Sequence, residues 1–231
     1  MEQQIKKWYQ KWWGILLLIF AISLLTFAII FGFYVFSLVK QNQMPETVSS
    51  QSTIQSIRNI AENKTNYFKG SNNPKITIVE FSDFLCPYCQ ESSSIIDSIV
   101  KKHNNDIKLI IRDLPIHTNS KDLALLARCA GEQNKFWPMH DLLFSNQLDQ
   151  SLSIDEQIKS YITSLNLDMT KFNSCIGSKK YYSSIEKDIA DAITLDIKST
   201  PAWIINGYKA EGALTADAWE KIIQKILANV N

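Results

Sequence analysis

A pair of cysteines three positions apart is the feature that most restricts how this chain of 231 residues can fold. The motif Cys86-Pro87-Tyr88-Cys89 follows the strand-like run Ile76–Phe81 and precedes a stretch with helical spacing. Two cysteines at this spacing can close a disulfide when the first lies at a helix start and the second lies one turn in. There, unsatisfied backbone N–H groups and the helix dipole stabilise a thiolate on the first sulfur. The pattern predicts dithiol chemistry with Cys86 as the reactive thiol.

The rest of the chain after Pro74 predicts an α/β fold. Strand-like and helical patterns alternate around the cysteine motif, which is typical of a right-handed βαβ unit with parallel strands. A block from about 118 to 195 has helical spacing without a convincing strand, so we expect a helical subdomain inserted into the frame. Asn206-Gly207 between two apolar runs predicts a β-hairpin. The predicted frame is strand Ile76–Phe81, helix Pro87–His103, strand Ile107–Arg112, the insert, hairpin strands Ala202–Ile205 and Tyr208–Ala210, and helix Thr215–Ala228.

An apolar segment near the N-terminus predicts a membrane anchor. Residues 14–39 carry no charge, and as a helix they would span ~39 Å against a hydrocarbon core of ~30 Å. Lys6, Lys7 and Lys11 precede the segment and only Lys40 follows directly, which favours a cytoplasmic N-terminus. A cleaved signal peptide is the alternative, but its apolar core is usually shorter and ends in a small-x-small site. We predict a cytoplasmic segment 1–13, a transmembrane anchor 14–39, a polar tether 40–73 and a globular domain 74–231.

Charge and cysteine content agree with an exported domain. Of 24 basic and 23 acidic residues, four basic and one acidic precede residue 41, so the part beyond the anchor has a formal charge of −2. Such a neutral domain has no nucleic-acid footprint. All four cysteines lie in this part, and an even number in an oxidising compartment usually forms two disulfides. Neither a second Cys-x-x-Cys nor a closely spaced histidine pair completes a zinc site.

The element order and three motifs resemble the DsbA-like thiol:disulfide oxidoreductases of the thioredoxin superfamily. The resemblance covers roughly residues 70–230. It rests on the run from Val79 to Cys89, on Cys-Ala-Gly and Phe-Trp-x-Met-His-Asp within Ala127–Phe144, and on Thr200-Pro201 followed by Ala-Trp. It implies a thioredoxin-like fold with a helical insert, preceded here by one transmembrane helix, and an enzyme that needs no dissociable cofactor and no metal.

The resemblance assigns roles around the cysteine motif. Pro201 would be cis and face the sulfurs, and Thr200 would offer its backbone to an extended client peptide; Pro87 and Tyr88 would also contact the client. Strand alternation puts Glu80 on the face of Ile76 and Ile78. A buried Glu80 would shuttle the proton of Cys89 as a third catalytic residue beside the two cysteines, whereas the alternative is a solvated edge residue.

Six further residues lie outside the cysteine motif and its proline loop. Cys129 and Cys175 fit the second disulfide that some relatives carry in the helical subdomain, and two buried free thiols are the alternative. Asp83 is expected in the turn before the helix. Trp203 could line the client groove or lie in the core. His117 and His140 are assigned to structure or surface.

The expected function is an extracytoplasmic protein disulfide oxidoreductase, anchored in the cell membrane by a single span, that introduces disulfides into exported proteins. Its clients would be unfolded exported proteins with cysteines, and a membrane quinone-linked partner, DsbB-like or VKOR-like, would reoxidise it. Tyr88 supplies no cation where many strong oxidases have histidine. A disulfide isomerase or reductase, and a redox-inert peptide-binding chaperone module, therefore stay open, as does the choice between periplasm and cell surface.

Overall fold

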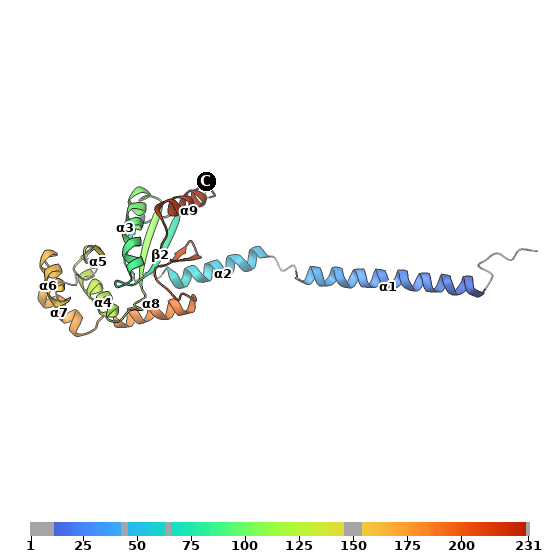
Figure 1. The fold of residues 1–231 in the computed structure, drawn as a ribbon, viewed down its shortest axis with the longest axis horizontal. Helices are drawn as coiled ribbons and strands as arrows, with labels where there is room; N and C mark the ends of the chain where they lie inside the picture. Colours follow the sequence, from blue (N-terminus) through green and yellow to red (C-terminus); the bar gives the residue numbers. More distant parts are fainter. Residues whose placement is uncertain (1–11, 43–45, 63–65, 146–153, 230–231) are drawn as a thin grey trace, which may run out of the picture. The chain divides into compact units, whose positions relative to one another are not determined.

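The computed structural model describes residues 12–42, 46–62, 66–145 and 154–229, drawn in Figure 1. The chain divides into two compact units, Met1–Ser52 and Thr53–Asn231. Lys6, Lys7 and Lys11, on which the expected cytoplasmic N-terminus depends, lie outside the described residues.

The first unit consists mainly of one long apolar helix. Helix α1 runs from Trp12 to Asn42, and its segment Ile15–Tyr34 has a mean hydropathy of 2.9 over 20 residues. The large apolar side chains in that segment are exposed. Exposed apolar side chains over this length are unfavourable in water but suit a bilayer. This helix could therefore span a membrane.

A five-stranded sheet forms the frame of the second unit (Figure 1). The strand order is β1-β3-β2-β4-β5, and β2 and β3 are parallel because helix α3 connects them. The remaining neighbours pair antiparallel. The strands and the two helices of the frame are β1 (Phe68–Gly70), β2 (Ile76–Ser82), α3 (Pro87–Lys102), β3 (Ile107–Asp113), β4 (Ala202–Ile205), β5 (Tyr208–Glu211) and α9 (Ala216–Ala228).

The sheet is covered on both faces, which explains why all seven residues of β2 are buried. Alternate residues of the strand point to opposite faces. Ile76 and Ile78 belong to the cluster that α3 and α9 cover, and Trp219 of α9 lies in the same cluster. Val79 and Phe81 pack on the other face, in a cluster with residues of α2 and α8. The predicted strands, helices and hairpin of the frame are confirmed to within a few residues.

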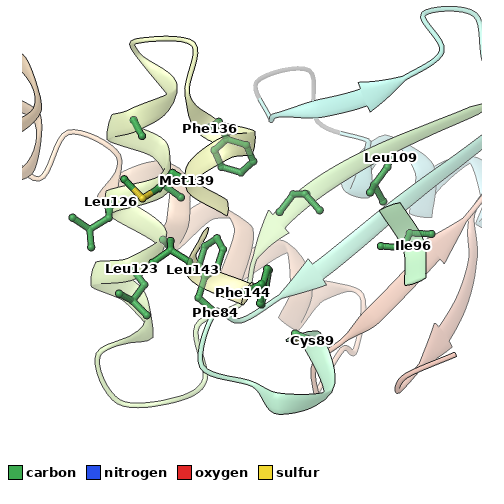
Figure 2. Packing of buried hydrophobic residues seen from close by; sticks show 14 of the residues in the cluster. Phe84, Cys89, Ile96, Leu109, Leu123, Leu126, Phe136, Met139, Leu143 and Phe144 are labelled. Atoms are coloured by element: carbon green, nitrogen blue, oxygen red, sulfur yellow. The ribbon is translucent and has the colours of Figure 1, made fainter. Parts of the chain in front are cut away.

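In the described residues 114–145 and 154–201, the insert between β3 and β4 contains five helices, as the helical spacing predicted. A disulfide between Cys129 and Cys175 joins α4 to α7. Figure 2 shows Phe84, which precedes the cysteine motif, among the apolar side chains of the insert, so the two parts share one core. The insert consists of α4 (Ser120–Gly131), α5 (Phe136–Ser145), α6 (Ile154–Ser164), α7 (Met169–Gly177) and α8 (Tyr182–Thr194).

The segment expected to be a polar tether contains a helix and a strand. Helix α2 spans Glu46–Ala61, and strand β1 adds to the sheet beside β3. The Arg112 guanidinium, which is fully buried, donates to the carbonyl oxygens of Ile60 and Ala61 at 3.0 and 2.9 Å. These bonds satisfy carbonyls that the end of a helix leaves unpaired. The folded unit therefore begins at Thr53, ahead of the expected boundary at residue 74.

Candidate active site

The cysteine motif lies where β2 passes into α3. Cys86 is the N-cap residue of α3 and Pro87 begins the helix. Pro suits that position because its missing N–H would have no partner there. The Cys86 carbonyl accepts from the backbone N–H groups of Cys89 and Gln90, each at 3.1 Å. Both cysteines are free thiols, and Cys86 lies at the positive end of the helix dipole.

The Cys86 sulfur faces the proline loop. Its thiol donates to the Thr200 carbonyl oxygen at 3.3 Å, and the Thr200–Pro201 peptide bond is cis. The loop therefore lies beside the Cys86 sulfur, as the resemblance implied. Cys86 is only 3% exposed, whereas Tyr88 in the same turn is 62% exposed.

Glu80 lies inside the domain beside the cysteine pair. It is 1% exposed and pairs with Trp203 of β4 and Ile111 of β3 in the sheet. Burial raises the pKa of its carboxyl group to about 7, although a hydrogen bond from Ser82 acts in the opposite direction. A solvated Glu80 at a sheet edge is therefore excluded. A carboxyl group with this pKa can both accept and release a proton near neutrality.

Cys89 differs from Cys86 in its surroundings. It is fully buried, and burial raises the pKa of its thiol well above the ordinary value. The nearby charge of Glu80 raises the pKa further, while hydrogen bonds to the Ser82 side chain and the Asp83 backbone lower it in part. The Cys89 thiol is thus favoured in its neutral, protonated form.

Asp83 connects the cysteine turn with the entry to the helical insert. It is 1% exposed, and one carboxylate oxygen accepts from Leu85 N–H at 2.7 Å. The other accepts from the N–H groups of Ile116 and His117 at 2.7 and 2.9 Å and from the Ser120 hydroxyl at 3.0 Å. The predicted turn role is observed, but the sequence did not indicate the contacts across 33 to 37 positions.

Helix α5 supports the active-site helix from the insert. The Gln90 side-chain amide donates to the Phe144 carbonyl oxygen at 2.7 Å. His140 is 3% exposed and its ring packs edge-on against Phe84 and Phe144, with centroids 5.6 and 4.9 Å away. His140 thus has a structural position, as expected. Trp203 is fully buried and belongs to the core, so it does not line a client groove.

Two residues near the cysteines were missed by the sequence analysis. Ser82 donates to Glu80 at 2.8 Å, and Gln90 holds α3 to α5. Ser82 could have been found from strand alternation, because it lies two residues beyond Glu80 on the same face. Gln90 had no such signal. Within the described residues, no cluster of three or more His, Cys, Asp or Glu side chains could hold a metal ion.

Together, the fold and the cysteine pair at a helix start define a thioredoxin-fold domain with a helical insert. The family model described as Thioredoxin matches residues 62–225. The chain belongs to the thioredoxin family.

Solved structures share this architecture. The thiol-disulfide exchange protein alpha-DsbA2 of Wolbachia pipientis has a TM-score of 0.67 at 22% identity, with 80% of this chain and 99% of that chain covered. BdbD of Bacillus subtilis has a TM-score of 0.63 at 22% identity, over 71% and 93%. A periplasmic thioredoxin-like protein of Salmonella enterica serovar Typhimurium is 25% identical, with a TM-score of 0.61 over 74% and 96%.

Curated relatives include larger proteins with a different name. A Na(+)/H(+) antiporter NhaA of Herminiimonas arsenicoxydans is 24% identical over 194 residues, which are 83% of this chain and 30% of the antiporter. An NhaA of Salinispora arenicola is 27% identical over 165 residues, 70% of this chain and 25% of the antiporter. The chain therefore spans less than a third of the length of these relatives, and their name describes proteins with much additional sequence.

Proposed function

We propose that this protein is a membrane-anchored, extracytoplasmic protein thiol:disulfide oxidoreductase that introduces disulfides into exported proteins. The observation that carries the proposal is the geometry of one sulfur. Cys86 caps the start of α3, and its sulfur lies 3.3 Å from the Thr200 carbonyl oxygen beside Pro201. A helix start favours a thiolate and hence a good leaving group.

In the proposed reaction, Cys86 and Cys89 begin as a disulfide. A client thiolate attacks the Cys86 sulfur, which breaks the bond to Cys89 and forms a mixed disulfide. A second client thiolate attacks the client sulfur of that bond, and Cys86 leaves with the electron pair. The client gains a disulfide, and the protein is left with the dithiol. Glu80 would return the proton that Cys89 requires, since the pKa of its carboxyl group is about 7.

The client would be an unfolded, exported protein with cysteines, held as an extended segment against the Thr200–Pro201 loop. Pro87 and Tyr88 would contact the client segment from the opposite side, and Tyr88 is 62% exposed, so its ring is accessible to a client. Cys129–Cys175 would keep the insert folded without joining the exchange. No dissociable cofactor or metal is needed, because the electrons move between sulfur atoms alone.

The apolar helix α1 supports an anchor with a cytoplasmic N-terminus and the folded unit outside, in a periplasm or at a cell surface. A membrane partner linked to quinone, DsbB-like or VKOR-like, would restore the Cys86–Cys89 disulfide after each cycle. In the proposed topology, residues 1–13 lie in the cytoplasm, residues 14–39 span the bilayer and the catalytic domain lies outside. The tether is confined to the residues between the span and Thr53.

The direction of exchange is tested with the full chain in detergent. Equilibration with glutathione buffers gives the reduction potential of the Cys86–Cys89 pair, and the oxidised chain is mixed with a reduced, unfolded client to measure disulfide formation. An oxidase should have a potential nearer about −120 mV than the thioredoxin value of about −270 mV. A potential near the thioredoxin value would favour the reductase. Disulfide reshuffling without net oxidation would favour the isomerase, and no exchange at all would favour a redox-inert binding module.

A further inference from the structure

A buried hydroxyl lies between the two groups that must exchange a proton in this reaction. Ser82 ends β2 and is 6% exposed. Its Oγ donates to Glu80 Oε1 at 2.8 Å, and Cys89 lies in the cluster on the same face of the sheet, where the Ser82 side chain lowers the pKa of its thiol. Ser82 and Glu80 point to the same face of the sheet because they are two residues apart. Helix α3, which carries Cys89, covers that face.

We propose that Ser82 relays the proton of Cys89 to Glu80 when Cys89 attacks a mixed disulfide on Cys86. The inference rests on the proposed function, because this attack returns the exchange centre to its disulfide form. The Ser82 oxygen accepts the proton from the Cys89 sulfur, and the Ser82 hydroxyl proton passes to the Glu80 carboxylate. The Cys89 thiolate then bonds to the Cys86 sulfur, and the departing thiolate leaves with the electron pair of the broken bond.

The surroundings of Cys89 make such a relay necessary. Cys89 is fully buried, so its sulfur has no direct route to bulk water. Its thiol pKa lies well above the ordinary value because of burial and the charge on Glu80. A hydroxyl group can accept one hydrogen bond while it donates another. Ser82 can therefore accept the proton from Cys89 and pass its own hydroxyl proton to Glu80 in one step, so that no charge stays on the serine oxygen.

The groups near Glu80 do not prevent its carboxylate from accepting a proton. Its sheet neighbours Ile111 and Trp203 carry no charge. Lys69 on β1 lowers the pKa of Glu80 by its positive charge, but the Lys69 ammonium is bound by Asp97 of α3 at 2.5 Å. Burial outweighs this effect, and the pKa of Glu80 is about 7. The relay should therefore slow as pH falls below about 7, where Glu80 already carries a proton.

The test uses the reduced full chain in detergent and an excess of the aromatic disulfide dithiobis(nitrobenzoate). Cys86 releases one thionitrobenzoate as it forms a mixed disulfide, and Cys89 releases the second when it resolves that bond. Stopped-flow absorbance separates the two phases. The matched variants are Ser82→Thr and Ser82→Val, because Thr and Val have nearly the same shape and only Thr keeps the hydroxyl. The Cys89→Ser variant should lack the second phase, which identifies that phase as the reaction of Cys89.

Ser82→Val should slow the second phase by about 10²-fold, the lower end of what a positioned acid–base group contributes. It should leave the first phase unchanged, and it should lose the rise in rate through pH 7. Ser82→Thr should keep both the rate and the pH profile. Glu80→Gln should slow the second phase of the native protein. In the Ser82→Val background it should slow that phase little further, because the effects of two residues on one proton path are not additive.

Equal second-phase rates for the Thr and Val variants would overturn the relay, whether both are fast or both are slow, because the hydroxyl would then make no difference. A Val variant that does not fold leaves the Glu80→Gln comparison, in which an unchanged pH profile would also reject the relay. Absence of the first phase in the native protein is a separate result: Cys86 would not be reactive, and the proposed function would fail before the relay is reached.

Discussion

The domain contains two cysteine pairs with nearly equal burial and different surroundings. Cys86 and Cys89 are 3% and 0% exposed, and Cys129 and Cys175 are 1% and 4% exposed. Burial therefore does not distinguish them. Cys129 and Cys175 are joined across two helices in an apolar cluster.

Cys86 and Cys89 belong to the same apolar cluster, but polar atoms also lie beside their sulfurs. The Thr200 carbonyl oxygen faces Cys86, and Ser82 and Glu80 lie beside Cys89. Polar groups can stabilise a thiolate or move a proton, whereas an apolar cluster does neither. The comparison teaches that the chemistry of a cysteine pair follows from the atoms around the sulfurs more than from exposure.

The largest expected effect separates the pairs by activity. Cys86→Ser should abolish disulfide formation in a reduced client, because no sulfur remains for the client to attack. The double variant Cys129→Ala with Cys175→Ala should keep comparable activity while folded, since neither sulfur takes part. The measurement is the rate of client oxidation by the full chain. Activity that survives Cys86→Ser, or disappears with the second pair alone while the fold is intact, would contradict the comparison.

The next effect separates the pairs by stability. Removing Cys129–Cys175 should lower the free energy of unfolding by about 4 kcal/mol, because the bond closes a loop of 46 positions. Closing the Cys86–Cys89 disulfide should also lower the free energy of unfolding, unlike closing Cys129–Cys175, because an oxidising pair is more stable as the dithiol. Denaturant unfolding of the oxidised and selectively reduced chain measures both. A gain in stability on closing Cys86–Cys89 would argue against an oxidase.

The buried Glu80 beside Cys86 and Cys89 should make the free energy of unfolding depend on pH. The folded pKa is about 7, above ~4.3 in the unfolded chain. Because the folded state binds the Glu80 proton more tightly, protonated Glu80 stabilises the fold fully at pH values below the unfolded pKa. This contribution to the free energy of unfolding is lost as pH rises through 7. Glu80→Gln should therefore be more stable than the native protein above pH 7, by up to roughly 3 kcal/mol, and the difference should vanish near pH 4. Unfolding curves that stay parallel from pH 4 to 8 would contradict this sign.

Tyr88→His should produce the smallest effect. A protonated histidine near the Cys86 sulfur would stabilise the thiolate, but the side chain at this position is 62% exposed, and solvent screens the interaction. We expect the reduction potential to rise by about 30 mV, equivalent to ~1.4 kcal/mol. Tyr88→Phe is the control and should move the potential less. A fall in potential with histidine would mean that the middle residues of the motif act in another way.

Much of this fold could be predicted because its central elements have clear patterns. Strand β2 ends just before the cysteine motif, and the Asn206-Gly207 turn marks the hairpin. Strand β1 could not be predicted, since its three residues are too few to show a period and lie in a polar stretch. The burial of Arg112 and its ion pairs could not be predicted from the sequence either, because its partners Asp188 and Asp191 are 76 and 79 positions away.

The candidate site was predictable where the chemistry lies within a local motif. The positions of the cysteines follow from spacing, and alternation predicts the face on which Glu80 lies, whereas its burial was expected from the family resemblance. The contact between Cys86 and Thr200 spans 114 positions, and spacing alone carries no information about it; the family resemblance supplied the expectation. Ser82 was overlooked because an isolated serine is common at strand ends.

The carboxylate of Asp83 has a consequence for motion in the domain. It binds Leu85 of the cysteine turn and, through its second oxygen, the loop at Ile116 and His117 and the start of α4 at Ser120. These segments are thereby clamped together. A hinge between the insert and the sheet cannot lie at this point without breaking these hydrogen bonds, so the cysteine turn and the start of α4 should move as one body.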